Sequence, residues 1–253
     1  MQAAESRVDV SVLQDTQVAS FDEDYVCEAE WQILQAGLRE HLGDRWFRFL
    51  DVGGGNGKFG DRLLAAYPRA TGVILDNAKQ LLGRNTPNPR KSLVEGSALD
   101  LKRHFGAERF DLIVFNWVLH HMVTPEYRRT RALQARVLAQ AGGLLNPGGI
   151  ISISENLYEG LLMKSLPGKL IYGLTSTARL APVTSRLGAN TAGVGVCFLT
   201  QGEIQEDAFR AGLDFIRFQK GYPKRMSLAR RALLQVRAAH HGHFLFGSTV
   251  RGD

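Results

Sequence analysis

Residues 49–60 read FLDVGGGNGKFG, an apolar run with one acid that continues into four glycines within five residues. Glycines directly after a strand let the backbone approach a ligand closely, and they bring the N-terminus of the next helix beside it. The stretch satisfies two patterns at once. One is G-x-G-x-x-G at Gly55, Gly57 and Gly60, which is typical of dinucleotide sites. The other is D-x-G-x-G-x-G, which starts at Asp51.

The acid in front of the glycines distinguishes between two ligands. A carboxylate at the mouth of the loop would repel a pyrophosphate, whereas it would attract S-adenosylmethionine (SAM), which carries an ammonium and a sulfonium group. A second acid, Asp76, ends the next apolar run, TGVILD at residues 71–76. An acid there can accept hydrogen bonds from the ribose hydroxyls of either cofactor. Asp51 therefore favours SAM over a dinucleotide.

The composition indicates a soluble globular protein. The 253 residues are 44% hydrophobic and 22% charged, and no apolar run reaches the length of about 20 residues that crosses a bilayer. The N-terminus lacks a signal-peptide pattern. Cys27 and Cys197 are too few and too far apart for a disulfide framework or a metal site, so we expect a reducing, cytoplasmic location.

Apolar strands alternate with amphipathic helices along residues 45–155, which predicts an α/β fold. The continuous apolar run RFDLIVFNW, residues 109–117, is typical of a parallel sheet covered on both faces. TQGEIQEDAFRAGL predicts a helix with a capping box at Thr200 and Glu203. Residues 213–222 and 241–250 predict two closing antiparallel strands. We expect a doubly wound Rossmann-like sheet, mostly parallel with an antiparallel edge strand, plus a lid insert.

We interpret residues 1–253 as a single domain with an N-terminal helix at 21–43 and a substrate lid at 156–199. The net charge is +6, and no acid lies between Glu159 and Glu203 or between Asp214 and Asp253. Such stretches are solvated surface, or they attract an anion: a phosphate, a carboxylate or a lipid surface. An apolar, basic lid suits a small hydrophobic substrate with an anionic group. The alternative is that residues 156–199 only cover the site, or form a contact in a homodimer.

Five stretches together resemble the class I SAM-dependent methyltransferase family, in order and at the family's spacing: LDVGGGNGKFG, TGVILDNAKQLL, EGSALDL, RFDLIVFNWVLHHM and LLNPGGIISISE. Two positions depart from the family pattern, because Ser97 stands where an acid is frequent and Asn146 where lysine is commoner. The resemblance implies SAM as cofactor, held by Asp51, Gly53, Gly55, Gly57, Asp76, Asn77, Ser97, Ala98 and Asn116.

His120 and His121 are the candidate catalytic bases, since a histidine that titrates near neutral pH can deprotonate a phenol or enol. Their alternative role is that of hydrogen-bonded core histidines, and His121 is the better candidate of the two. His240, His241 and His243 lack a nearby cysteine or acid in sequence, so we predict no metal site. Aromatic residues of the N-terminal helix either cover the cofactor or pack as core: Phe21, Tyr25 and Trp31.

The function expected is SAM-dependent methylation of O, N or C in a small hydrophobic metabolite, for example in secondary metabolism. Three alternatives remain. An RNA methyltransferase would use the basic C-terminal region, but no N-P-P-[YF]-type tetrapeptide follows the fourth strand, so nucleic acid is the less favoured partner. A non-catalytic SAM-binding protein would keep the same loop. A dinucleotide oxidoreductase is disfavoured by Asp51.

Overall fold

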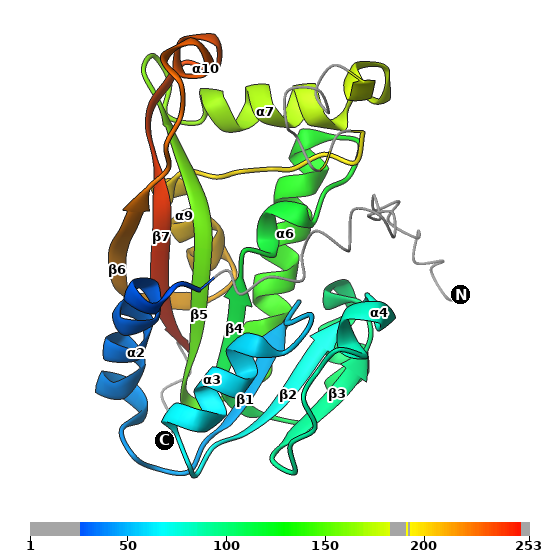
Figure 1. The fold of residues 1–253 in the computed structure, drawn as a ribbon, viewed down its shortest axis with the longest axis vertical. Helices are drawn as coiled ribbons and strands as arrows, with labels where there is room; N and C mark the ends of the chain where they lie inside the picture. Colours follow the sequence, from blue (N-terminus) through cyan, green and yellow to red (C-terminus); the bar gives the residue numbers. More distant parts are fainter. Residues whose placement is uncertain (1–25, 183–190, 192, 249–253) are drawn as a thin grey trace.

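The computed structural model describes residues 26–182, 191 and 193–248, which form one seven-stranded sheet in the order β3-β2-β1-β4-β5-β7-β6 (Figure 1). β1 to β5 pair in parallel, β7 is antiparallel to β5, and β6 is antiparallel to β7. The strands are β1 (Arg48–Val52), β2 (Thr71–Asp76), β3 (Lys91–Glu95), β4 (Phe110–Asn116), β5 (Leu145–Gly160), β6 (Leu213–Pro223) and β7 (Val236–Ser248). The expected fold class is confirmed.

Helices cover both faces of the sheet and bury two apolar layers. α2 and α3 contribute to one layer, in which Leu38, Phe49 and Leu63 are fully buried. α5, α6 and α9 contribute to the other, which includes Val137 and Phe115. The helices are α2 (Glu28–Leu42), α3 (Lys58–Ala66), α4 (Lys79–Leu82), α5 (Leu101–Phe105), α6 (Tyr127–Gly142), α7 (Leu166–Ser176), α9 (Gln201–Arg210) and α10 (Leu228–Leu233), with short 3-10 turns η2 (Ala98–Asp100), η3 (Leu119–His121) and η4 (Ala178–Leu180).

The predicted capping box at the start of α9 is confirmed. The Thr200 hydroxyl accepts from the Glu203 backbone N–H at 3.2 Å, and the Glu203 carboxylate accepts from the Thr200 backbone N–H at 3.0 Å. α9 then packs on α6 through Arg131, whose guanidinium donates to Asp207 at 2.8 Å and to Glu203 at 2.7 Å. A local sequence signal and a long-range ion pair therefore fix the same helix.

Several element boundaries differ from the sequence prediction. β5 continues to Gly160, so the segment predicted as a lid from residue 156 begins as strand. β7 starts at Val236, five residues before the predicted start at 241. The helix predicted at 21–43 is α2, and residues 21–25 lie outside the described residues.

Two helices have no counterpart in the sequence prediction. α7 follows β5 inside the predicted lid, and α10 joins β6 to β7. Both lie at the far end of the long strands β5 and β7, away from the parallel strands β1 to β3 (Figure 1). Among the described residues, no helix combines the length and the hydropathy that crossing a membrane requires.

Candidate functional site

The glycine loop between β1 and α3 adopts a backbone that favours glycine. Gly53, Gly55 and Gly57 have φ values of +71°, +50° and +72°, in the left-handed region. Two contacts fix the loop: the Gly53 N–H donates to the Leu75 carbonyl of β2 at 2.7 Å, and the side-chain amide of Asn85, which follows α4, donates to the Gly55 carbonyl at 2.8 Å. The three glycines therefore present their backbone at the carboxyl ends of β1 and β2.

Asp51 lies inside this turn and is almost completely buried. Its Oδ2 has no hydrogen-bond partner among the described residues. Burial raises the pKa of Asp51 to about 7, with a further increase from the neighbouring Asp76 carboxylate and an opposing effect of Lys91. A carboxylate that is buried without a partner carries a large desolvation cost, which a cationic ligand would offset.

Asp76 at the end of β2 is tied to the loop by two backbone donors. Its Oδ2 accepts from the Gly55 N–H at 2.9 Å and its Oδ1 from the Ala78 N–H at 2.7 Å. Burial raises its pKa, while these hydrogen bonds oppose the increase. Asn77, the next residue, is exposed. Each carboxylate oxygen keeps a lone pair, so Asp76 can still accept hydroxyl donors from a ligand.

The adenine-contact turn predicted at Ser97 and Ala98 follows β3. The Ser97 hydroxyl accepts from the Leu99 N–H at 3.2 Å and caps η2, of which Ala98 is the first residue. Both residues are half-buried. Ser97 stands where an acid is frequent in the family, and its side chain caps η2.

Asn116 ends β4 beside the glycine loop, since β4 pairs with β1. Neither its side-chain nitrogen nor its side-chain oxygen has a partner among the described residues, although both atoms are buried. The next residue, Trp117, has φ +52°, a strained conformation for a bulky side chain. The Trp117 N–H donates to the Ser154 carbonyl at 2.8 Å, which fixes the turn into η3. An unpaired amide and a strained turn are typical of a ligand site.

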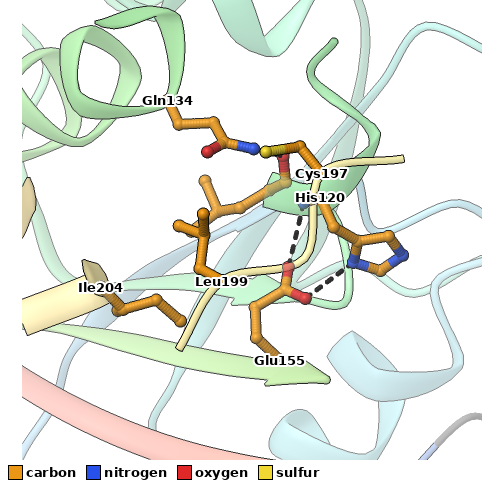
Figure 2. A pocket seen from close by; sticks show the side chains of 7 residues that line it. His120, Gln134, Glu155, Cys197, Leu199 and Ile204 are labelled. Atoms are coloured by element: carbon orange, nitrogen blue, oxygen red, sulfur yellow. Dashed lines mark hydrogen bonds and ion pairs between the residues drawn. The ribbon is translucent and has the colours of Figure 1, made fainter. Parts of the chain in front are cut away.

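The two candidate bases lie in η3 and differ in their surroundings. His120 is buried, and its Nδ1 contacts the Glu155 carboxylate at 2.6 Å (Figure 2). The other Glu155 oxygen accepts from the His120 backbone N–H at 3.3 Å. The His121 ring lies 4.1 Å from the His120 ring, and burial, with a contribution from His120, lowers the pKa of His121 well below 6.5. The lowered pKa favours the neutral imidazole of His121, and it also makes His121 a weaker base than a free histidine.

A small cavity lies on the side of His120 that faces α6 and α9. Its volume is about 10 Å³, which is room for about one water molecule and not for a cofactor. Figure 2 shows Glu155 between the His120 ring on one side and Leu199 and Ile204 on the other. The lining side chains are Leu119, His120, Gln134, Glu155, Cys197, Leu199 and Ile204. The cavity therefore belongs to the packing that holds the His120–Glu155 pair.

A second buried ion pair was missed by the sequence analysis. Glu30 of α2 is 2% exposed and contacts Nδ1 of His241 on β7. His243 lies 4.0 Å from the same carboxylate and contacts the Ser154 hydroxyl through its Nδ1 at 3.0 Å. The Trp117 ring packs against His241 at 5.5 Å. Glu30 shares one helix face with Leu34 and Leu38, so an acid in that apolar stripe was the available signal.

The remaining predicted residues fall outside the glycine loop. Trp31 packs edge-on against Phe59 at 5.9 Å and under the Arg62 guanidinium at 5.5 Å, as core. Phe21 and Tyr25 lie outside the described residues.

Within the described part of the chain, no three His, Cys, Asp or Glu side chains are arranged to hold a metal ion. The Asn146 amide at the start of β5 donates to Asp111 of β4 at 3.1 Å.

Comparisons with known proteins place this geometry in context. Residues 50–151 match a family model described as a methyltransferase domain. Three solved structures share the fold: the N-methyltransferase NodS from Bradyrhizobium japonicum WM9 in complex with S-adenosyl-L-homocysteine (14% identity, 93% of this chain and 98% of that chain, TM-score 0.55), the cyclopropane synthase MmaA2 from Mycobacterium tuberculosis (17%, 90% and 88%, 0.57) and the cyclase SpnF (13%, 88% and 83%, 0.59).

Among curated proteins, none matches the sequence of this chain. The solved structures are less than 25% identical to it and carry three different activities in their names, so their likeness concerns the fold.

Proposed function

We propose that the chain is a class I, SAM-dependent methyltransferase that methylates a small hydrophobic metabolite, and the match of residues 50–151 to a methyltransferase-domain model supports the family. The single observation that supports the cofactor best is the buried Asp51 carboxylate, whose Oδ2 lacks a partner among the described residues. A cation beside this atom would remove the desolvation cost that raises its pKa to about 7.

The polar groups of the site suit the parts of SAM. When bound, SAM supplies a methyl group on a positively charged sulfur. Asp51 attracts the positive charge, and the Asn116 amide has both a donor and an acceptor to offer. Asp76 holds the loop and keeps lone pairs for ribose hydroxyls. Because Gly53, Gly55 and Gly57 have no side chain, a ligand can approach the backbone of the loop closely.

We infer that His121 accepts the proton when the acceptor must lose one. His121 is the last residue of η3, in the turn that follows β4, and burial favours its neutral imidazole. His120 is a positioning residue, because its Nδ1 is occupied by Glu155 and its ring lies against that of His121. The Glu155 contact also fixes η3 through the His120 backbone N–H.

The acceptor is inferred from the segment that follows β5. Residues 160–202 contain no acid, and α7 is rich in leucine, with Lys169 exposed. A segment of this composition suits an apolar acceptor with a carboxylate or another anionic group. RNA is the second candidate acceptor, supported only by the basic C-terminal region.

Calorimetry tests the cofactor. We expect binding of SAM and none of NAD, and we expect Asp51→Asn to weaken SAM binding at least tenfold, because it removes a buried counter-charge. Asp214→Asn makes the same charge change at an exposed position on β6 and should leave affinity unaltered. NAD binding, or an unaltered affinity of Asp51→Asn, would contradict the assignment.

Transfer of a tritiated methyl group from SAM tests the acceptor and the base. Organic acids and phenols should be labelled in preference to RNA, and any RNA binding should show the salt dependence of phosphate contacts. With an acceptor in hand, His121→Ala should lower kcat by about a hundredfold or more while SAM affinity is retained. Unaltered kcat would remove His121 from the reaction.

A further inference from the structure

β5 and β7 extend beyond the parallel sheet and end in a tip (Figure 1). The last residue pair between β4 and β5 is Asn116 and Ser154, whereas β5 continues with β7 to Gly160, a further distance of about 20 Å. The tip consists of the loop Leu161–Met163 and of α10, and the Leu161 N–H donates to the Gln235 carbonyl directly after α10 at 2.9 Å. The two segments therefore form one surface.

This tip exposes large apolar side chains. Leu228 and Leu162 are 83% and 81% exposed, more than any other large hydrophobic residue among those described. Leu233, Leu161 and Met163, on the same two segments, are also more than half exposed. A single exposed leucine is ordinary, but five on adjoining segments make a patch that marks an interaction site.

The same tip is positively charged. The exposed cations on it and beside it are Lys164, Arg225, Arg230, Arg231 and Arg237. The sequence contains no acid at 160–202 or 215–248, so neither segment supplies a counter-charge. Glu159, the acid before the loop, accepts from the Gln201 backbone N–H at 3.3 Å and is directed toward α9. Arg231 contacts the backbone carbonyl of Val236, a neutral acceptor that leaves its charge in place.

We propose that the tip docks on the surface of a bilayer that contains anionic lipids. Leucine and methionine side chains insert at the boundary of headgroups and acyl chains, and the surrounding cations meet the lipid phosphates and carboxylates. A second copy of the chain would bring an equally positive patch against the first, which is electrostatically unfavourable. Nucleic acid would engage the arginines and leave five exposed apolar side chains without a partner.

Co-sedimentation of the full chain with vesicles tests the proposal. We expect binding to vesicles of phosphatidylcholine with phosphatidylserine, weaker binding at high salt, and little binding to phosphatidylcholine alone. Leu162→Asp and Leu228→Asp should each weaken binding about tenfold, and Arg231→Glu about fivefold or more. Phe209→Asp changes a side chain on α9 that is 78% exposed, away from the tip, and should bind like the unaltered protein.

Two further measurements keep the result interpretable. Circular dichroism of each variant should match the unaltered chain, since the substituted side chains are exposed. Light scattering should show the same molar mass with and without Leu228→Asp. Equal binding to both vesicle types, loss of binding in Phe209→Asp, or a dimer that Leu228→Asp dissociates would each overturn the proposal. SAM binding of Leu228→Asp should be unchanged, so failure here leaves the proposed function untouched.

Discussion

The buried carboxylate at the end of β1 and the buried carboxylates around β5 and β7 differ in whether another side chain contacts them. At the carboxyl ends of β1 and β4, Asp51 and Asn116 bury polar atoms without partners among the described residues. Around β5 and β7, the buried carboxylates Glu30 and Glu155 each contact a histidine. Unpartnered polar atoms cost stability and are retained where a ligand completes them, whereas partnered ones stabilise the fold itself. The buried Asp51 carboxylate is therefore suited to a cationic ligand, whereas the Glu30 and Glu155 carboxylates support the fold itself, although β5 and β7 also bury polar atoms without a described partner, at Ser152 and His240.

The largest expected effect is on stability, around β5 and β7, where histidines contact the buried carboxylates. Glu30→Ala should lower the free energy of unfolding by about 3 kcal/mol, because it removes the buried carboxylate that His241 contacts. Glu40→Ala on the same helix is the matched control. Its exposed pair with Arg217 at 2.9 Å should cost less than about 1 kcal/mol. Urea denaturation measures both, and equal losses would mean that the Glu30 pair carries no special weight.

The next largest effect is expected from a change in the backbone of the glycine loop. Gly57→Ala should lower the free energy of unfolding by about 2 kcal/mol and abolish SAM binding, because φ is +72° and a Cβ would lie 1.7 Å from the Asn85 side-chain oxygen. Gly173→Ala in α7 is the control, since nothing lies within 4 Å of its added methyl group. It should raise the free energy of unfolding by about 0.5–1 kcal/mol. Thermal unfolding and calorimetry separate the two outcomes.

The two regions also differed in how far the sequence predicted them. The glycine loop, β2 at residues 71–76 and the α9 capping box were predicted, because their signals are local in the chain. The extension of β5 was missed because Glu155 and Asn156 are buried polar residues that interrupt the apolar pattern. The Glu30–His241 contact joins residues 211 positions apart, and no local pattern reports such a pair. The glycine loop can be predicted from neighbouring residues in the sequence, whereas the pairing of buried polar side chains depends on the tertiary fold.

The smallest expected effect concerns the pH dependence of the Asp51 site. The pKa of Asp51 is raised from 3.8 to about 7, so the folded protein without ligand holds a proton there that the unfolded chain releases at lower pH. This contribution to stability therefore falls as the pH rises from 3.8 to about 7. Under the proposed role of Asp51, SAM binds the ionised carboxylate, so the affinity for SAM should change with the opposite sign. It should rise roughly tenfold from about pH 6 to about pH 8 and level off above.

Calorimetry in buffers of different ionisation enthalpy measures the proton released on binding, and Asp51→Asn identifies its source. Asp76 also has a raised pKa, from burial, and remains in that variant, so the difference between the two proteins isolates Asp51. S-Adenosylhomocysteine, which lacks the sulfonium charge, should show a weaker pH dependence than SAM. If Asp51→Asn kept the full pH dependence, the unpartnered carboxylate would not be what selects the cation, and the contrast between the two regions would lose its functional meaning.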